Sequence, residues 1–324
     1  MNILVTGGAG YIGSHVVKDL LLNKNNNIII VDNLSTGTVS SVLGAKLIVL
    51  DLLDEVSLEK VFRKYNFDII MHFAASIIVS ESIENPLDYY TNNSFTTLVL
   101  LKLANKYKVS KFIFSSTAAI YGESLSKMVS ESEKLLPINP YGMSKLFSEK
   151  MIIDNAKVNK NFKFCILRYF NVAGADIGGI IGQSKKEGTH LIKVACQTAL
   201  GEREFLKIFG NTYNTKDGTC IRDYIHINDL SEAHIKAISY LENNKSEIFN
   251  CGYGEGYSVL EVINMIKKIS AVDFDVKIVE NRKGDVPILI ANNKKIRKLM
   301  GWTPKYNNLE LICKTAYEWE KKLK

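Results

Sequence analysis

A tyrosine and a lysine stand four residues apart in the segment 140–145, which reads Pro-Tyr-Gly-Met-Ser-Lys. Pro140 is typical of a helix start, and the spacing of four places Tyr141 and Lys145 on one helical face. Because a nearby ammonium favours the ionised phenol, we expect the pKa of Tyr141 to fall below its ordinary value of about 10. Such a tyrosine is a general base near neutral pH. The pair alone also arises by chance on helices.

Hydroxyl side chains end an apolar run that precedes this pair, at Ser115, Ser116 and Thr117. We expect Thr117 to lie beside Tyr141, where its hydroxyl can hydrogen-bond an oxygen of the substrate. A strand end that is merely rich in Ser and Thr is an equally good interpretation of this segment by itself. Thr117, Tyr141 and Lys145 are therefore the predicted catalytic group.

The chain opens with an apolar run that leads into glycines at positions 7, 10 and 13, and a helical pattern follows from Tyr11. Strand, glycine loop and helix in this order are typical of a dinucleotide-binding loop. Gly7, Gly10 and Gly13 would allow a sharp turn, close approach of a pyrophosphate and tight packing of helix on strand. The helix N-terminus would face the phosphates with free N–H groups.

An acidic residue ends each of the next two apolar runs. Asp32 follows Gly13 at close to the ~20-residue spacing expected for an acid that binds the adenosine ribose. Its charge would repel a 2′-phosphate, so the sequence favours NAD over NADP. Asp32 could equally cap a turn, and both roles are compatible. Asp51 ends the following run and is a plausible neighbour of the adenine.

Bulk composition is that of an ordinary globular protein: 324 residues, 46% hydrophobic and 23% charged, with a net charge of +7. The lysines are dispersed and no basic stripe is interleaved with aromatic residues, so we expect no nucleic-acid partner. The five cysteines lack metal-ligand spacing, which predicts buried free thiols in a reducing cytoplasm and no metal site. We also expect no signal peptide and no membrane-spanning segment.

Apolar strand-like runs alternate with helical stretches at 3–6, 28–32, 47–51, 69–74, 112–116 and 164–169. This alternation predicts an α/β fold with a Rossmann-type, doubly wound parallel sheet, whose ligands bind at the carboxyl ends of the strands. The pattern becomes irregular beyond about residue 170. We therefore expect an NAD-binding domain at 1–170 and a smaller mixed α/β substrate domain at 171–324, with some segments returning to the first domain.

The motifs taken together resemble the UDP-glucose 4-epimerase branch of the extended short-chain dehydrogenase/reductase family, and the resemblance covers essentially the whole chain. Two matching segments, LRYFNVAG and DGTCIRDYIH, separate this branch from the wider family. The matching segments are 5–15, 32–35, 72–75, 86–93, 115–122, 139–145, 167–174 and 217–226.

The resemblance implies two sets of ligand-binding residues. The first set would line the NAD site, together with Gly7, Gly10 and Gly13: Tyr11, Ile12, Asp32, Asn33, Asp51, Leu52, Phe73, Ala74, Asn92, Tyr141, Lys145 and Phe170. The second set would hold a UDP-sugar: Thr117, Asn171, Leu191, Phe209, Arg222, Arg282, Asp285 and Leu289. Two arginines suit a diphosphate, because charge-assisted N–H donors recognise phosphate well.

The reaction implied by the resemblance is C4 epimerisation of UDP-hexoses through a transient 4-keto sugar, with tightly bound NAD regenerated in each turnover. Tyr141 would take the proton of the 4-hydroxyl, Thr117 would position that oxygen, and Lys145 would hold the ribose. The family also implies a homodimer, formed through helices near 90–107 and 141–157.

At some positions the chain differs from related members of the family, and these differences bear on its reaction and substrates. Related dehydratases and decarboxylases carry acidic groups just after the catalytic hydroxyl, where this chain has Ala118, Ala119 and Ile120. At 76–78 the chain has Ser-Ile-Ile, where some epimerases have a lysine that contacts cofactor phosphate. In related epimerases a bulky tyrosine in the wall of the sugar pocket blocks 2-acetamido sugars, and the resemblance places Leu289 at the matching position. This predicts activity on UDP-GlcNAc and UDP-GalNAc as well, unless Leu289 serves only in core packing.

Three other functions remain open at this point: a nucleotide-sugar reductase that releases its cofactor, a dehydratase of the same family, and a non-catalytic sensor of NAD. A sensor has no need of the Tyr141 and Lys145 pair. A reductase would depend strictly on added cofactor.

Overall fold

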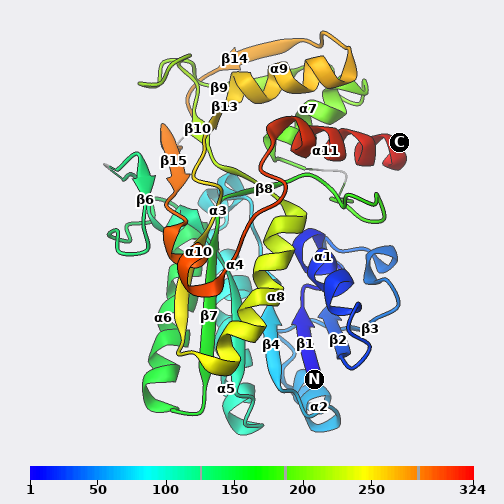
Figure 1. The fold of residues 1–324 in the computed structure, drawn as a ribbon, viewed down its shortest axis with the longest axis vertical. Helices are drawn as coiled ribbons and strands as arrows, with labels where there is room; N and C mark the ends of the chain where they lie inside the picture. The colour runs from blue at the N-terminus through cyan, green and yellow to red at the C-terminus, as the bar shows by residue number, and fades with distance from the viewer. Residues whose placement is uncertain (125, 186–187, 283–284) are drawn as a thin grey trace.

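Seven parallel strands form the main sheet of the computed structural model, which describes residues 1–124, 126–185, 188–282 and 285–324. Their order is β12-β7-β5-β4-β1-β2-β3. Figure 1 shows this sheet in the lower half of the molecule. The strands are β1 (Asn2–Thr6), β2 (Asn27–Asp32), β3 (Lys46–Val49), β4 (Ile69–His72), β5 (Lys111–Thr117), β7 (Lys163–Tyr169) and β12 (Glu247–Cys251).

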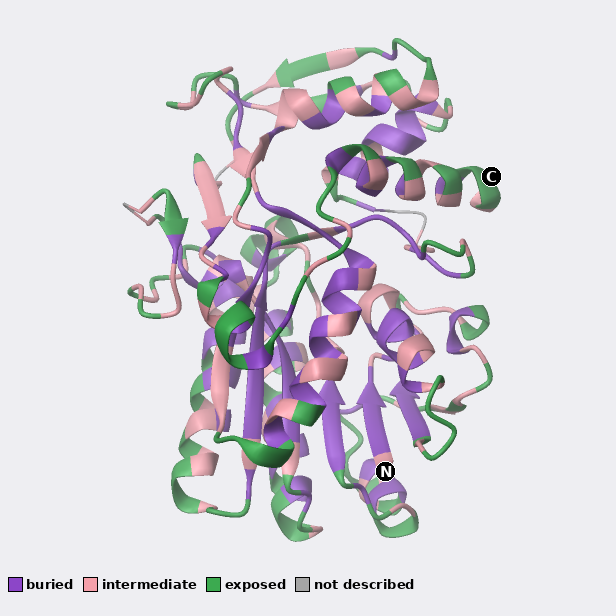
Figure 2. Ribbon diagram, viewed as in Figure 1, coloured by how far each residue is buried: buried purple, intermediate pink, exposed green. Residues whose placement is uncertain are grey.

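Helices cover both faces of this sheet, because successive side chains of a strand point to opposite sides. In β1, Ile3 and Val5 pack with α1 (Tyr11–Leu20) and α8 (Ile227–Asn243). Leu4 packs on the other face with α2 (Glu55–Lys64) and α5 (Thr96–Lys106), next to α6 (Pro140–Val158). Figure 2 shows the strands as the buried centre of this half. The predicted Rossmann-type α/β fold is confirmed.

A second, smaller part contains short strands and helices from the later half of the chain (upper half of Figure 1). Its four-stranded sheet has the order β13-β10-β15-β6. The bounds are β13 (Tyr257–Ser258), β10 (Ile221–Arg222), β15 (Ile288–Ala291) and β6 (Met128–Val129). Two strand pairs accompany it: β8 (Asn171–Ala173) with β11 (Tyr224–His226), and β9 (Leu206–Phe209) with β14 (Val276–Val279). Its helices are α7 (Leu191–Ala199), α9 (Val259–Ser270) and α11 (Leu309–Leu323).

The remaining elements are short and lie near the strand ends. They are the 3-10 turns η1 (Val39–Val42) and η3 (Ala118–Ile120), the π-helix η2 (Tyr90–Phe95), and the helices α3 (Val79–Glu84), α4 (Pro86–Tyr89) and α10 (Lys294–Met300). The π-helix joins α4 to α5, and π-turns of this kind are frequent at functional sites.

Two segments cross the sequence boundary at residue 170. β12 comes from the later half, yet it pairs with β7 at the edge of the main sheet. β6 comes from the earlier half, yet it pairs with β15 in the smaller sheet. The sequence pattern did not reveal β12 as a strand of the main sheet, because its apolar run is short and follows a stretch of irregular pattern.

No helix among the described residues is long and apolar enough to cross a membrane. The five cysteines are unpaired and buried. Within residues 1–124, 126–185, 188–282 and 285–324, no group of three or more His, Cys, Asp or Glu side chains is arranged to hold a metal ion.

Candidate active site

The tyrosine and the lysine lie at the start of α6, as the motif predicted. Pro140 occupies the first turn, and the side chain of Asn139 caps the helix by accepting a hydrogen bond from the N–H of Gly142 at 2.8 Å. This cap fixes where the helix begins, and therefore which face Tyr141 and Lys145 share. Strand β5 ends at Thr117, whose hydroxyl accepts a hydrogen bond from the N–H of Ala119 at 3.1 Å and lies near enough to the Tyr141 phenol to lower the pKa of that phenol.

Lys145 is almost completely buried, with 3% of its surface exposed. Its Nζ donates a hydrogen bond to the carbonyl oxygen of Ser115 at 2.9 Å. The same Nζ lies 4.8 Å from the centre of the Phe114 ring, where the aromatic face attracts a cation. An ammonium has three donors, so the Ser115 contact leaves two of them for a ligand.

The expected fall in the pKa of Tyr141 is wrong for the chain by itself. Burial raises the pKa of Tyr141, and the hydrogen bond from Thr117 opposes that rise. Burial also lowers the pKa of Lys145 to about 7, while the charge of Glu149 opposes that fall. The sequence argument counted the ammonium and left out desolvation, which disfavours both charged forms.

Gly7 and Gly8 in the loop after β1, and Gly13 in the first turn of α1, lie too close to other atoms to carry a Cβ. Gly7 has a φ of 73°, and a Cβ there would lie 2.5 Å from the backbone nitrogen of Ala74. A Cβ on Gly13 would lie 2.3 Å from the carbonyl oxygen of Gly7. A Cβ on Gly10 would meet only that same oxygen within 4 Å, at 3.3 Å. The loop therefore packs tightly against the end of β4 and against α1, and it leaves space beside Gly10.

These features fit a dinucleotide. Gly10 is the N-cap of α1, and among residues 11–14 no acidic side chain occupies the first turn. The N–H groups of Tyr11 and Ile12 would therefore face a bound phosphate with the positive end of the helix dipole. Open space beside Gly10 gives that phosphate a place to approach the backbone.

Asp32 lies at the carboxyl end of β2, next to the glycine loop, and is buried. Its carboxylate accepts hydrogen bonds from the N–H groups of Ala9 at 3.0 Å and Leu34 at 2.8 Å. Both proposed roles are therefore compatible, because each carboxylate oxygen keeps acceptor capacity for a ribose hydroxyl. Beyond it, the Asn33 side chain donates to Asp51 at 2.9 Å, so these two predicted residues lie together.

The other residues of the predicted NAD set surround the same strand ends. Phe73 and Ala74 both donate N–H groups to the carbonyl oxygen of Thr6, which ties the end of β4 to β1. Asn92 lies on the π-helix and donates to the Ser76 hydroxyl at 2.9 Å. Leu52 and Phe170 are buried.

Most of the predicted UDP-sugar set meets in the smaller part of the molecule. Arg222 on β10 lies opposite Leu289 on β15, and its Nη2 lies 3.7 Å from the carboxylate of Asp285. The Arg282 guanidinium stacks 3.9 Å from the centre of the Phe209 ring. Asn171 begins β8 and bonds the carbonyl oxygen of Asp223, which follows Arg222 in the chain. Leu191 begins α7 and packs against the core shared with α1 and α8.

Comparison with known proteins identifies the family. A family model described as GDP-mannose 4,6 dehydratase matches residues 4–315. A UDP-glucose 4-epimerase of Azospirillum brasilense is 45% identical over 324 residues, which cover 99% of this chain and 92% of that protein. The chain belongs to the UDP-glucose 4-epimerase family. This membership agrees with the extended short-chain dehydrogenase/reductase motifs in the sequence.

Solved structures of epimerases share the fold over the full chain. The UDP-Glc/GlcNAc 4-epimerase of Campylobacter jejuni is 50% identical, with a TM-score of 0.87 and coverage of 99% of both chains. The UDP-glucose 4-epimerase of Bifidobacterium longum, solved in complex with NAD+ and UDP, is 35% identical, with a TM-score of 0.95. That match covers 99% of this chain and 98% of the other.

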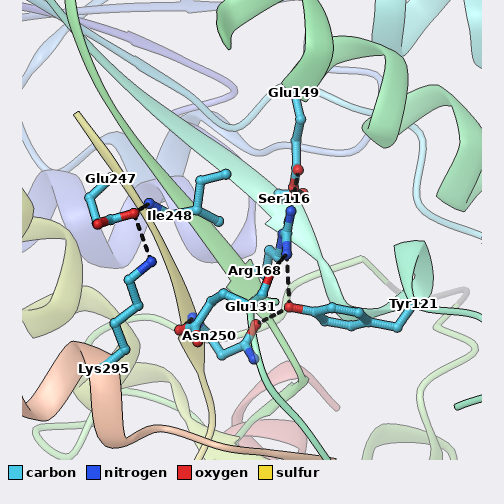
Figure 3. A network of polar contacts seen from close by, with 9 residues as sticks. All are labelled: Ser116, Tyr121, Glu131, Glu149, Arg168, Glu247, Ile248, Asn250 and Lys295. Carbon is cyan, nitrogen blue, oxygen red and sulfur yellow. Dashed lines mark hydrogen bonds and ion pairs between the residues drawn. The ribbon is translucent and has the colours of Figure 1, made fainter. Parts of the chain in front are cut away.

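Sequence reasoning missed a set of buried polar residues behind the epimerase motifs. Glu149 accepts hydrogen bonds from Ser116 and Arg168, and Arg168 also donates to Tyr121 (Figure 3). Asn93 on the π-helix donates to the Ser144 hydroxyl at 2.9 Å. One signal was available in the sequence: Glu149 follows Lys145 by four residues, and Arg168 stands inside an apolar strand.

Proposed function

We propose that this protein is an NAD-dependent enzyme that interconverts UDP-hexoses at C4 through a transient 4-keto sugar. The observation that carries the proposal is the placement of Tyr141 and the buried Lys145 four residues apart on α6, with Thr117 at the carboxyl end of β5 close enough to the phenol to lower its pKa. Family membership supports the same reaction. A bound NAD would supply a hydride acceptor that returns the hydride within the same turnover.

The residues of the chain have distinct parts in this proposal. The Tyr141 phenolate would accept the proton of the sugar 4-hydroxyl and later return it, while Thr117 holds that oxygen in place. Lys145 would direct its two remaining N–H donors to the cofactor ribose. The glycine loop, Asp32, Asn33 and Asp51 would hold the rest of the dinucleotide.

Arg222 and Arg282 would bind the diphosphate and keep the nucleotide attached while the sugar turns. Arg222 already faces a carboxylate, Asp285, at 3.7 Å, so its guanidinium is oriented before ligand binds. Charge-assisted hydrogen bonds to phosphate are stronger than neutral ones, which suits a clamp that must not release an oxidised intermediate.

A dehydratase is the less favoured reaction, although the matching family model carries that name. Elimination of water needs an acid and a base close to the sugar. The three residues after Thr117 form the turn η3 and are Ala118, Ala119 and Ile120, none of which can transfer a proton. Oxidation and re-reduction at C4 need no such group.

We further propose that 2-acetamido sugars are accepted. Leu289 is half-buried, lies opposite Arg222 and packs with the apolar cluster that includes Phe170. Its side chain is shorter than a tyrosine, which leaves space for an acetamido group at the sugar pocket. The 50% identity to an epimerase named for both UDP-Glc and UDP-GlcNAc supports this extension.

The assembly that we propose is a homodimer. Leu87, Phe95 and Phe147 are exposed apolar side chains on α4, η2 and α6, and Tyr90 stacks near Phe147 with 5.8 Å between ring centres. Large apolar side chains exposed on neighbouring elements favour an interface. Residues 1–170 would form the NAD-binding domain and 171–324 the UDP-sugar domain, with α8 and β12 returning to the first.

The five unpaired cysteines support a cytoplasmic location.

One experiment separates these functions. Purified, dialysed protein is incubated with UDP-glucose, UDP-galactose, UDP-GlcNAc or UDP-GalNAc without added cofactor, and the products are resolved by chromatography. We expect each sugar to be converted to its C4 epimer. Strict dependence on added NADH or NADPH would instead indicate a reductase, a 4-keto-6-deoxy product a dehydratase, and no turnover with bound NAD a sensor.

A further inference from the structure

The carboxylate of Glu149 is completely enclosed behind the active site, with 1% of the residue exposed. One oxygen accepts from the Ser116 hydroxyl at 2.5 Å and from Arg168 Nε at 3.1 Å, and the other accepts from Arg168 Nη2 at 2.7 Å. Arg168 is itself 2% exposed. Figure 3 shows Glu149, Ser116 and Arg168 meeting from three different elements, α6, β5 and β7.

The position of Glu149 makes these contacts unexpected. It stands one helical turn after Lys145, and oppositely charged residues at this spacing ordinarily pair with each other. Here Lys145 makes no ion pair with any described residue and instead donates to the Ser115 carbonyl oxygen. Arg168 and Ser116 therefore hold the nearest carboxylate away from the ammonium.

Arg168 is in turn held in one orientation. Its Nη1 donates to the Tyr121 hydroxyl at 2.9 Å, and that hydroxyl donates to Asn250 at 2.6 Å. Asn250 lies on β12, beside β7. A bidentate arginine and carboxylate pair with a further arginine donor bonded to Tyr121 has little freedom to rearrange.

We propose that Arg168 and Ser116 form a clamp on the Glu149 carboxylate, and that this clamp sets the protonation and the free N–H donors of Lys145. Glu149, Arg168 and Ser116 are then positioning residues for the epimerase reaction. Glu149 stands one helical turn from Lys145, and its charge opposes the fall in the pKa of Lys145 that burial causes. The clamp prevents the Glu149 carboxylate from accepting hydrogen bonds from the Lys145 N–H groups that would bind the cofactor ribose. This inference rests on the proposed function of Lys145.

Other titratable groups around Lys145 are neutral or belong to the catalytic group. Burial and the charge of Lys145 lower the pKa of His72 on β4 to about 3. Burial raises the pKa of Tyr169 on β7 well above its ordinary value. Tyr89 on α4 contacts Tyr141 and bonds Glu81 on α3, and burial raises its pKa as well. Glu149 is thus the charged neighbour that opposes the effect of burial on the ionisation of Lys145, and Arg168 bonds that carboxylate.

The clamp predicts that substitutions of Glu149 and of Arg168 shift the alkaline limb of kcat against pH in opposite directions. Activity that needs the Lys145 ammonium falls as pH rises through the pKa of Lys145. Glu149→Gln removes the favourable charge, so the alkaline limb of kcat should move down by about one pH unit. Arg168→Met frees Glu149 to pair with Lys145, so the limb should move up while kcat falls about tenfold. Ser116→Ala should act like Arg168→Met, with a smaller shift.

The experiment compares these variants with wild type by kcat and KM against pH, by NAD retained per protomer after gel filtration across the same pH range, and by melting temperature. Asp229→Asn is the matched control, because Asp229 is a fully buried carboxylate on α8 that accepts from Tyr253 and from the N–H groups of Lys305 and Tyr306. It should lower the melting temperature and leave the limb in place.

The clamp is supported if Glu149→Gln and Arg168→Met shift the alkaline limbs of both activity and NAD retention in opposite directions. Variants that lose melting temperature with unshifted limbs, or that shift in one common direction, overturn it. If wild-type protein converts no UDP-sugar, the proposed function fails instead. In that case the pH dependence of NAD retention still tests the clamp, since it reports Lys145 without turnover.

Discussion

Tyr141, Lys145 and Thr117 come from one strand and the helix that follows it, whereas Phe209, Arg222, Arg282 and Leu289 come from separate segments of the later half of the chain. The first group stands against a buried network with fixed hydrogen bonds. The second group is half-buried, and its members meet through a stacked ring and a 3.7 Å ion pair. We infer that the proposed catalytic group needs fixed distances, whereas the proposed nucleotide-binding group needs charge and some freedom to adapt.

The sharpest way to test this comparison is to remove the base. Tyr141→Phe deletes one hydroxyl and leaves the half-buried ring in place. We expect kcat to fall by about 10²- to 10⁴-fold, because general base catalysis contributes that much. The NAD content should stay near that of wild type. Turnover close to the wild-type rate would remove Tyr141 from its assigned role.

Substitution in the glycine loop should break the cofactor side of the first region. A Cβ in Gly7→Ala would lie 2.5 Å from the backbone nitrogen of Ala74 at a φ of 73°. We expect a loss of about 1–3 kcal/mol in stability and a marked loss of bound NAD, measured by melting and by released NAD. Gly201→Ala is the control, since Gly201 has a φ of 76° with no atom within 4 Å. Equal NAD loss in both variants would contradict the close-packing argument.

Substitution of Arg222 in the second region should change the binding of the substrate more than the rate of the chemical step. Arg222→Met removes a charged donor while keeping the stem, and a hydrogen bond to a charged group is worth about 1.5–3 kcal/mol. We therefore expect KM for UDP-galactose to rise by about 10- to 100-fold, with a smaller change in kcat. Lys277→Met is a control cation in the same part of the chain, stacked on Phe205. A large fall in kcat with unchanged KM would contradict the division of labour.

Specificity should give the smallest effect. Leu289→Tyr adds bulk at the sugar pocket, and steric selection of this kind is worth about 1–3 kcal/mol. We expect kcat/KM for UDP-GlcNAc to fall by roughly tenfold or more, with UDP-glucose little changed. The neighbouring Ile290→Val serves as a control for disturbance of β15. Equal losses on both sugars would indicate that Leu289 acts only in packing.

The sequence predicted more of the first region than of the second. Six of the seven strands of the main sheet were expected from apolar runs, because local pattern and burial on both faces agree there. The strand β12 was missed, since its partner β7 is distant in the sequence. The residues Arg222, Arg282 and Leu289 were named through resemblance, because their spacing alone carries no sign that they meet.

Sequence by itself determined the glycine loop, the α/β alternation and the Tyr141–Lys145 spacing, because each depends on contacts between residues close in the chain. Only the tertiary structure decided the ionisation of that pair. Burial shifts both pKa values away from the catalytic state, and the position of Glu149 depends on Arg168 from a different strand. Desolvation and long-range pairing are properties of the packed molecule, so no local pattern of residues can express them.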